Sequence, residues 1–212
     1  MYDTYIFDLD GTLLDTLGDL AFSVNATLKK YGLKQRSVEE VCSFVGNGLK
    51  NLMKLAIGEE REDFPKILED LKSFYKDHCE DTTKPYDGIL PLLETLKANE
   101  KKIAIVSNKA DFAVKQLADT YFKGLVDVAI GENEDGGIRK KPAPDSVLLA
   151  MKSLNANPAS TVYIGDSDVD IKTAKNAYLP CICVTWGFRK ENFLREFGGE
   201  TFAYKPSDIM TL

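Results

Sequence analysis

The sequence predicts an α/β protein with a doubly wound, mainly parallel sheet and an inserted all-helical cap. Short, fully apolar runs alternate with segments of helical periodicity, as in a parallel sheet covered by helices on both faces. One stretch, residues 16–82, has helical periodicity but contains no strand-like run. We therefore expect a Rossmann-like α/β core of residues 1–15 plus 83–212 and a helical cap of residues 16–82.

Five short apolar runs are expected to form the strands of the sheet. They span residues 5–7, 103–106, 126–130, 162–164 and 181–184. Between the later runs, apolar residues recur at i, i+3 and i+4, which indicates helices with one face toward the sheet. These residues are Leu92, Leu93 and Leu96; Val114, Leu117 and Ala118; Val147, Leu148, Met151 and Leu154; and Ile171, Ala174 and Ala177.

The segment expected to form the cap has its own helix signals. Its first amphipathic stripe ends at Gly32, which is typical of the residue that follows a helix C-terminus. Ser37 and Glu40 fit a capping box at the start of the next helix. Polar and glycine-containing segments near residues 14–16 and at 82–88 are expected to link the cap to the core.

The composition excludes several classes of protein. With 44% hydrophobic residues among 212, wholesale disorder is excluded, and a chain of this length needs no disulfide bonds to fold. The net charge of −6 argues against a nucleic-acid partner, which requires clustered Lys and Arg. No apolar run approaches the ~18 residues of a membrane span, so we expect no membrane association.

The chain is expected to be cytoplasmic. Its first residues lack the basic start and apolar run of a signal peptide. Its four cysteines, Cys42, Cys79, Cys181 and Cys183, contain no C-x-x-C pair, which favours buried thiols in a reducing compartment over a metal or redox site. The oligomeric state is left open.

Two acids, Asp8 and Asp10, follow the first apolar run directly, in the segment Asp-Leu-Asp-Gly-Thr. Two carboxylates so close at a strand end repel each other strongly unless a cation lies near them. A simple turn that uses Gly11 is the structural alternative, and this segment alone leaves both interpretations open.

Polar residues follow two further runs. Ser107 and Asn108 follow the second run, and Asp166 and Asp170 follow the fourth, with Lys141 in the connection before it. Each of these residues, taken alone, also has an ordinary structural interpretation, as a helix cap, a turn residue or a solvated lysine. In an open parallel sheet, however, ligands bind beyond the carboxyl ends of the strands. Together these residues predict a site for a phosphoryl group and a divalent cation.

These segments resemble the sequence motifs of the haloacid dehalogenase-like superfamily. The four similar segments are Asp8-x-Asp10-Gly11-Thr12, Ser107, Lys141 and Gly165-Asp166-Ser167-x-x-Asp170. The resemblance covers nearly the whole chain and implies a doubly wound core with a helical cap inserted after the first strand. Residues 45–49 and 84–88 are also similar to the phosphoglycolate phosphatase-like branch. That branch often has Pro at the position of Asp87 and Gly at that of Tyr178.

The resemblance implies a Mg²⁺-dependent phosphatase that acts through an aspartyl-phosphate intermediate. Charge on a phosphate monoester must be neutralised before an anion can attack it, and Mg²⁺ prefers oxygen ligands. Mg²⁺ is expected to bind the carboxylates of Asp8 and Asp166 and the main-chain carbonyl of Asp10. Asp8 is the expected nucleophile, and Asp10 the expected general acid and base.

The remaining site residues have supporting roles in this resemblance. Those expected to hold the phosphoryl oxygens are Thr12, Ser107, Asn108 and Lys141. Thr12 also favours hydrolysis over transfer to another substrate. Asp170 is expected to orient Lys141 or the metal-bound waters.

The cap is expected to select the substrate, a small phosphorylated metabolite such as 2-phosphoglycolate. Asn47 and Lys50 are candidates for substrate contact, and a plain helix–helix turn is the alternative reading of their segment. Two other functions remain as alternatives. A phosphomutase on the same scaffold is disfavoured by Thr12, and a phospho-accepting signalling module would be shorter and lack the helical insertion.

Overall fold

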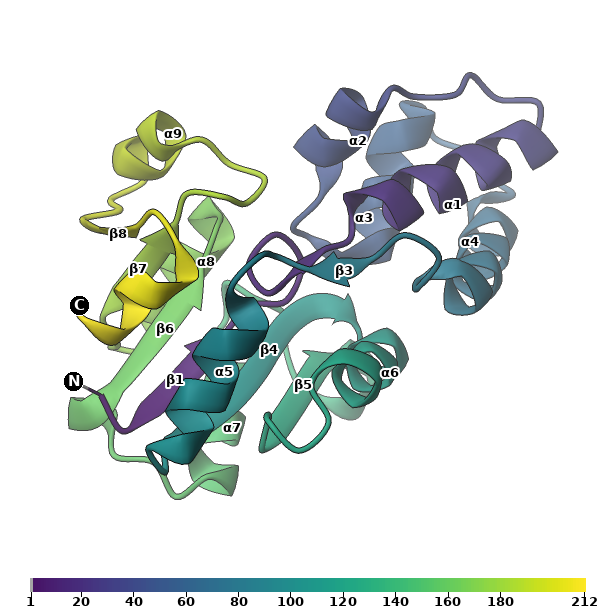
Figure 1. Cartoon of the computed structure of the whole chain (residues 1–212). Coiled ribbons are helices and arrows are strands. Elements are labelled where there is room, and N and C mark those ends of the chain that lie inside the picture. Colours follow the sequence, from purple (N-terminus) through teal and green to yellow (C-terminus); the bar gives the residue numbers. More distant parts are fainter. Residues whose placement is uncertain (1) are drawn as a thin grey trace.

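The structure, a computed structural model, describes residues 2–212 and confirms the α/β fold (Figure 1). A six-stranded sheet has the order β5-β4-β1-β6-β7-β8, and every neighbouring pair is parallel. Its strands are β1 (Thr4–Phe7), β4 (Lys102–Ala110), β5 (Val128–Glu132), β6 (Thr161–Gly165), β7 (Cys181–Val184) and β8 (Thr201–Ala203). All five expected runs lie in or overlap strands of this sheet.

Helices cover both faces of the sheet. Alternate strand residues point to opposite faces, so each face has its own apolar cluster. Tyr5 and Phe7 pack into a cluster with α5 (Ile89–Ala98) and α6 (Asp111–Tyr121). Ile6, between them, packs into a second cluster with α7 (Asp145–Ser153) and α8 (Asp168–Asn176). Figure 1 shows α5 in front of the sheet. The central strand β1 is therefore buried on both faces, as its uninterrupted apolar run predicts.

The last part of the chain, after β7, contains elements that the sequence patterns did not indicate. Strand β8 is three residues long and is followed by the short helix η3 (Pro206–Met210), while α9 (Glu191–Glu196) precedes it. Phe202 packs against Cys183 and Leu194, which extends the core beyond β7. A strand this short lacks a recognisable apolar run. Two further short helices are η1 (Glu134–Gly136) and η2 (Pro158–Ser160).

Four helices make up the expected cap region and lie to one side of the sheet (Figure 1). They are α1 (Leu17–Lys30), α2 (Val38–Phe44), α3 (Gly48–Ile57) and α4 (Phe64–His78). The predicted capping box of Ser37 and Glu40 is present, and Gly32 has the left-handed φ of +66° that ends α1. Among residues 2–212, the helices are all too short or too polar to cross a lipid bilayer.

A small antiparallel ribbon joins the four helices to the core. Strand β2 (Leu14–Asp15) pairs with β3 (Lys84–Pro85), so the outgoing and returning chain segments lie side by side. The buried carboxylate of Asp19 in α1 binds the segment that returns to the core, at Thr82 and Thr83. It accepts hydrogen bonds from the backbone N–H groups of Thr82, at 2.9 Å, and Thr83, also at 2.9 Å, and from the Thr82 hydroxyl. The cap boundaries at residues 16 and 82 stay a prediction, and they fall beside this ribbon.

Replacing Asp19 with Asn is expected to destabilise the protein by about 2 kcal/mol, since a charged acceptor of several buried donors is lost. Burial raises the pKa of Asp19, but the Thr82 and Thr83 donors outweigh it and hold that pKa below its usual value. The charged form therefore stabilises the fold above the pKa of the unfolded chain, and this stabilisation is lost as the pH falls through the folded-state pKa. Urea unfolding at pH 7 and pH 3 should show a difference between the two proteins that shrinks in acid. An equal difference at both pH values would contradict this role.

Candidate active site

The predicted site residues converge at the carboxyl edge of the sheet. Asp8 follows β1, Asp166 follows β6, and Ser107 lies in the last part of β4. These strands are neighbours in the order β4-β1-β6, so their ends meet at one point. The three residues line a single cavity with Asn108 and Lys141.

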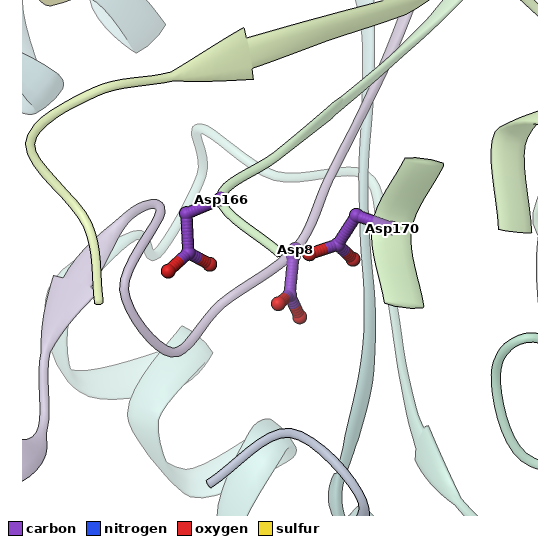
Figure 2. Close-up of side chains that lie close together, drawn as sticks. All are labelled: Asp8, Asp166 and Asp170. Atoms are coloured by element: carbon purple, nitrogen blue, oxygen red, sulfur yellow. The ribbon is translucent and has the colours of Figure 1, made fainter. Parts of the chain in front are cut away.

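Three buried carboxyl groups lie together in this cavity. Figure 2 shows Asp8 between Asp166 and Asp170, and an oxygen of each lies within 4.8 Å of an oxygen of the others. Burial, followed by the charge of Asp170, raises the pKa of Asp8 to about 7 and that of Asp166 well above its usual value. Carboxylates so crowded in a low-dielectric site require a compensating cation.

Asp170 already has partners for both of its oxygens. Its Oδ1 accepts from Lys141 Nζ at 2.8 Å and from the Tyr163 hydroxyl at 2.9 Å, and its Oδ2 accepts from the N–H and hydroxyl of Ser167. Burial lowers the pKa of Lys141, but Asp170 and Asp8 outweigh it, and the net shift is upward. The lysine is therefore a buried ammonium whose position Asp170 holds.

Asp8 and Asp166 have carboxylate oxygens that could still bind a cation. Asp8 Oδ1 lies 2.8 Å from Lys141 Nζ, yet among the described residues it is a buried oxygen that receives no well-aligned hydrogen bond. Asp166 Oδ2 accepts from the N–H of Phe188 at 2.7 Å, and its Oδ1 has a longer contact of 3.3 Å to the Thr12 hydroxyl. Two carboxylates with incompletely satisfied oxygens fit a hard divalent cation such as Mg²⁺.

Glycine is required beside Asp166. A Cβ atom on Gly11 would lie 2.4 Å from Asp166 Oδ2, and one on Gly187 would lie 2.4 Å from Asp166 Cβ. Gly11 also has a left-handed φ of +82°, which side chains disfavour. The glycine of the Asp-x-Asp-Gly segment therefore makes room for a carboxylate that lies 155 positions later in the chain.

Asp10 points to a different set of partners. Its Oδ1 accepts from Thr16 Oγ1 at 2.7 Å and from Lys109 Nζ at 2.8 Å. Burial lowers the pKa of Lys109, but Asp10 outweighs it and the net shift is upward, so the lysine is charged. Lys109 is a residue that the motif patterns did not single out. Its only sequence signal is its place two residues after Ser107, at the same strand end.

The other predicted phosphate-binding residues differ in their surroundings. The Asn108 side chain joins three segments: its Nδ2 donates to the carbonyls of Gly46 and Lys141, both at 2.9 Å, and its Oδ1 accepts from the Lys141 N–H at 2.7 Å. The Thr12 side chain is fully buried and contacts Asp166. Thr12 thus lies behind the carboxylate, whereas Ser107, Asn108 and Lys141 line the cavity.

The two cap candidates lie outside this cavity. Asn47 and Lys50 are both exposed. The cap residues that line the cavity are instead Leu20, Val45, Gly46, Gly48, Leu49 and Leu52. The cap side of the cavity is therefore mostly apolar, and the core side is polar.

Arg189 is a second residue that the sequence patterns missed. It lies in the loop after β7 and lines the cavity. Its guanidinium donates to the carbonyls of Cys42 and Val45, both at 2.9 Å, and of Ser43 at 3.4 Å. These carbonyls lie at the C-terminal end of α2, where the helix dipole favours a cation. The same loop supplies Phe188 N–H to Asp166, so it contacts both the acid cluster and the cap.

Comparison with known proteins gives consistent results. The sequence-family model of the haloacid dehalogenase-like hydrolases matches residues 5–184 of this chain. A phosphoglycolate phosphatase of Aquifex aeolicus is 32% identical over 209 residues, which cover 98% of this chain and 94% of that protein. The pyrophosphatase PpaX of Listeria innocua is 29% identical, with 99% of this chain and 95% of that protein covered.

A solved structure extends the similarity to the whole fold. A Lactobacillus delbrueckii subsp. bulgaricus protein, assigned as a phosphoglycolate phosphatase, has a TM-score of 0.91 and 35% identity. The match covers 98% of this chain and 96% of that one. Both the sheet and the helical insertion therefore have counterparts in that structure.

Replacing Arg189 with Ala is expected to loosen the contact between α2 and the core, since three carbonyls lose a charged donor. A loss of about 1–3 kcal/mol corresponds to local opening that is roughly 5- to 150-fold more frequent. Amide hydrogen exchange in α2 measures this rate. Arg195→Ala is the matched control, because Arg195 pairs with Glu191 on the exposed helix α9. Unchanged exchange in α2 of the Arg189 variant would contradict the inferred contact.

Proposed function

We propose a Mg²⁺-dependent reaction with an aspartyl-phosphate intermediate for this chain. The chain belongs to the haloacid dehalogenase-like hydrolase family, and it is a phosphoric monoester hydrolase. The observation that supports the proposal best is the buried Asp8 carboxylate, which lies 2.8 Å from the Lys141 ammonium at the convergence of three strand ends.

Mg²⁺ is the cation that this donor set fits. Asp8 and Asp166 would bind it through carboxylate oxygens, together with the main-chain carbonyl of Asp10. When bound, the ion neutralises charge on the phosphoryl group and on the crowded carboxylates. Asp170 would hold Lys141 in place, since its oxygens are already occupied.

The reaction would proceed in two displacements. An Asp8 carboxylate oxygen attacks phosphorus, and the bond between phosphorus and the ester oxygen breaks. Asp10 protonates the departing alkoxide. A water molecule then attacks the same phosphorus, and Asp10 accepts its proton. The P–O bond to Asp8 breaks, and inorganic phosphate leaves with the Asp8 carboxylate restored.

The phosphoryl oxygens would be held by residues of the core. Ser107 and the main-chain N–H of Asn108 would donate hydrogen bonds, and Lys141 would contribute its charge. Thr12, expected from its motif position to contact phosphate, acts through Asp166 in this proposal, because its hydroxyl contacts that carboxylate.

A small phosphorylated metabolite is the substrate class, and 2-phosphoglycolate is the first member to test. The names of the relatives favour it. Pyrophosphate is the second compound to test, because one relative is named a pyrophosphatase. A phosphomutase or a signalling module finds no specific support among the contacts of the site. The free thiols of Cys42, Cys79, Cys181 and Cys183 agree with the proposed cytoplasmic location.

Replacing Asp8 with Asn is expected to lower the rate of phosphate release by at least about 10³-fold, since an amide is a poor nucleophile. The measurement is phosphate release from a panel of metabolites that includes 2-phosphoglycolate and pyrophosphate. Asp168→Asn serves as the control, because Asp168 pairs with Lys172 on the exposed face of α8. An Asp8→Asn protein with full activity would refute the nucleophile assignment.

Removing divalent cations with a chelator is expected to abolish activity, and Mg²⁺ should restore it. Binding should also raise the melting temperature, because a ligand at 100 times its Kd stabilises the native state by about 2.7 kcal/mol. The Asp166→Asn variant should lose most of this thermal shift, while Asp168→Asn should keep it. An identical Mg²⁺-induced shift in the Asp166 variant and the wild type would rule out Asp166 as a ligand.

A further inference from the structure

Lys109 is a buried cation that none of the proposed steps uses. It lies in β4, and its side chain is 1% exposed. An ammonium in such a place costs free energy unless its surroundings compensate for the lost water. Its carboxylate partner is Asp10, the proposed acid and base, at 2.8 Å.

The cap supplies the second contact of Lys109. The ring of Tyr75, in α4, lies with its centroid 4.8 Å from Lys109 Nζ. Tyr75 is fully buried, and among the described residues its hydroxyl has no hydrogen-bond partner. The ring face of Tyr75 packs against the ammonium, and Tyr75 adds to the effect of Asp10 that raises the pKa of Lys109.

We propose that Lys109 is a positioning residue for Asp10 and that Tyr75 makes this positioning depend on the seated cap. Lys109 and Thr16 both bind Asp10 Oδ1, which leaves Oδ2 for proton transfer to the leaving group. Tyr75 covers Lys109 from the cap side. The carboxyl group of Asp10 is thus oriented for proton transfer only when α4 packs on the core. This inference rests on the proposed phosphatase reaction.

The test uses leaving groups that differ in their need for a proton. Phenyl phosphate and 4-nitrophenyl phosphate are similar in size, but nitrophenol is the more acidic phenol and departs readily without protonation. In Lys109→Met, kcat/KM for phenyl phosphate is expected to fall roughly 10²-fold, the scale of general acid catalysis. The loss for 4-nitrophenyl phosphate should be only a few-fold. This ratio isolates acid positioning, because kcat/KM reports the first displacement and not the later water attack.

Variants with related chemistry serve as controls. Lys109→Arg retains the charge and is expected to recover part of the ratio. Lys115→Met removes a charge from the exposed face of α6, where Lys115 pairs with Asp111, and should leave the ratio unchanged. A Lys109→Met ratio within about two-fold of the wild type would overturn the proposal.

Tyr75 variants test the cap contact separately, and they apply even where Lys109→Met folds poorly. Tyr75→Phe keeps the ring that covers Lys109, so the ratio should stay closer to that of the wild type than in Tyr75→Leu. Tyr75→Leu removes the ring and should shift the ratio in the same direction as Lys109→Met. Equal ratios in the two Tyr75 variants would overturn the role of the cap.

The outcomes separate this inference from the proposed function. If the wild type released no phosphate from either ester, or if Asp8→Asn kept full activity, the proposed reaction would fail. If the wild type were active and Asp8→Asn inactive while the Lys109 and Tyr75 variants left the ratio unmoved, only the positioning role would fail.

Discussion

Repulsion among buried carboxylates is the constraint on which the rest of the site depends. Asp8, Asp166 and Asp170 are nearly removed from water, so their mutual repulsion is weakly screened. Lys141 offsets part of this charge, and its two contacts to Asp8 and Asp170 hold it between them. Gly11 gives the space that lets Asp166 approach. A site built this way favours a cation and, through that cation, a dianionic phosphoryl group that the acids alone would repel.

The cap contacts the core through polar atoms of the active site itself. The carbonyls at the end of α2 bind Arg189, the Gly46 carbonyl binds Asn108, and Tyr75 covers Lys109. The core partners Asn108, Lys109 and Arg189 all line the cavity. Seating of the cap and the arrangement of the groups in the cavity are therefore linked through shared side chains.

The sequence was sufficient to predict the sheet and the convergence of Asp8, Ser107 and Asp166, because each follows an apolar run and strand ends of a parallel sheet share an edge. It was not sufficient for Lys109 or Arg189. Their partners are Tyr75 and the carbonyls of α2, which are distant in sequence and depend on how the cap sits on the core. The sequence also did not indicate that Asn47 and Lys50 would be exposed, because exposure depends on how α3 packs.

The central place of β1 has a consequence for how the chain folds during synthesis. Its neighbours β4 and β6 begin at Lys102 and Thr161, so β1 leaves the ribosome long before either of its edges can pair. The next elements to emerge are four helices whose contacts are mostly local, and such contacts form quickly. These helices can assemble while β1 is still unpaired, so the insertion lengthens the time for which this apolar strand lacks its partners. The cluster of Asp8, Asp166 and Asp170 forms late, since its last two members are synthesised after β4.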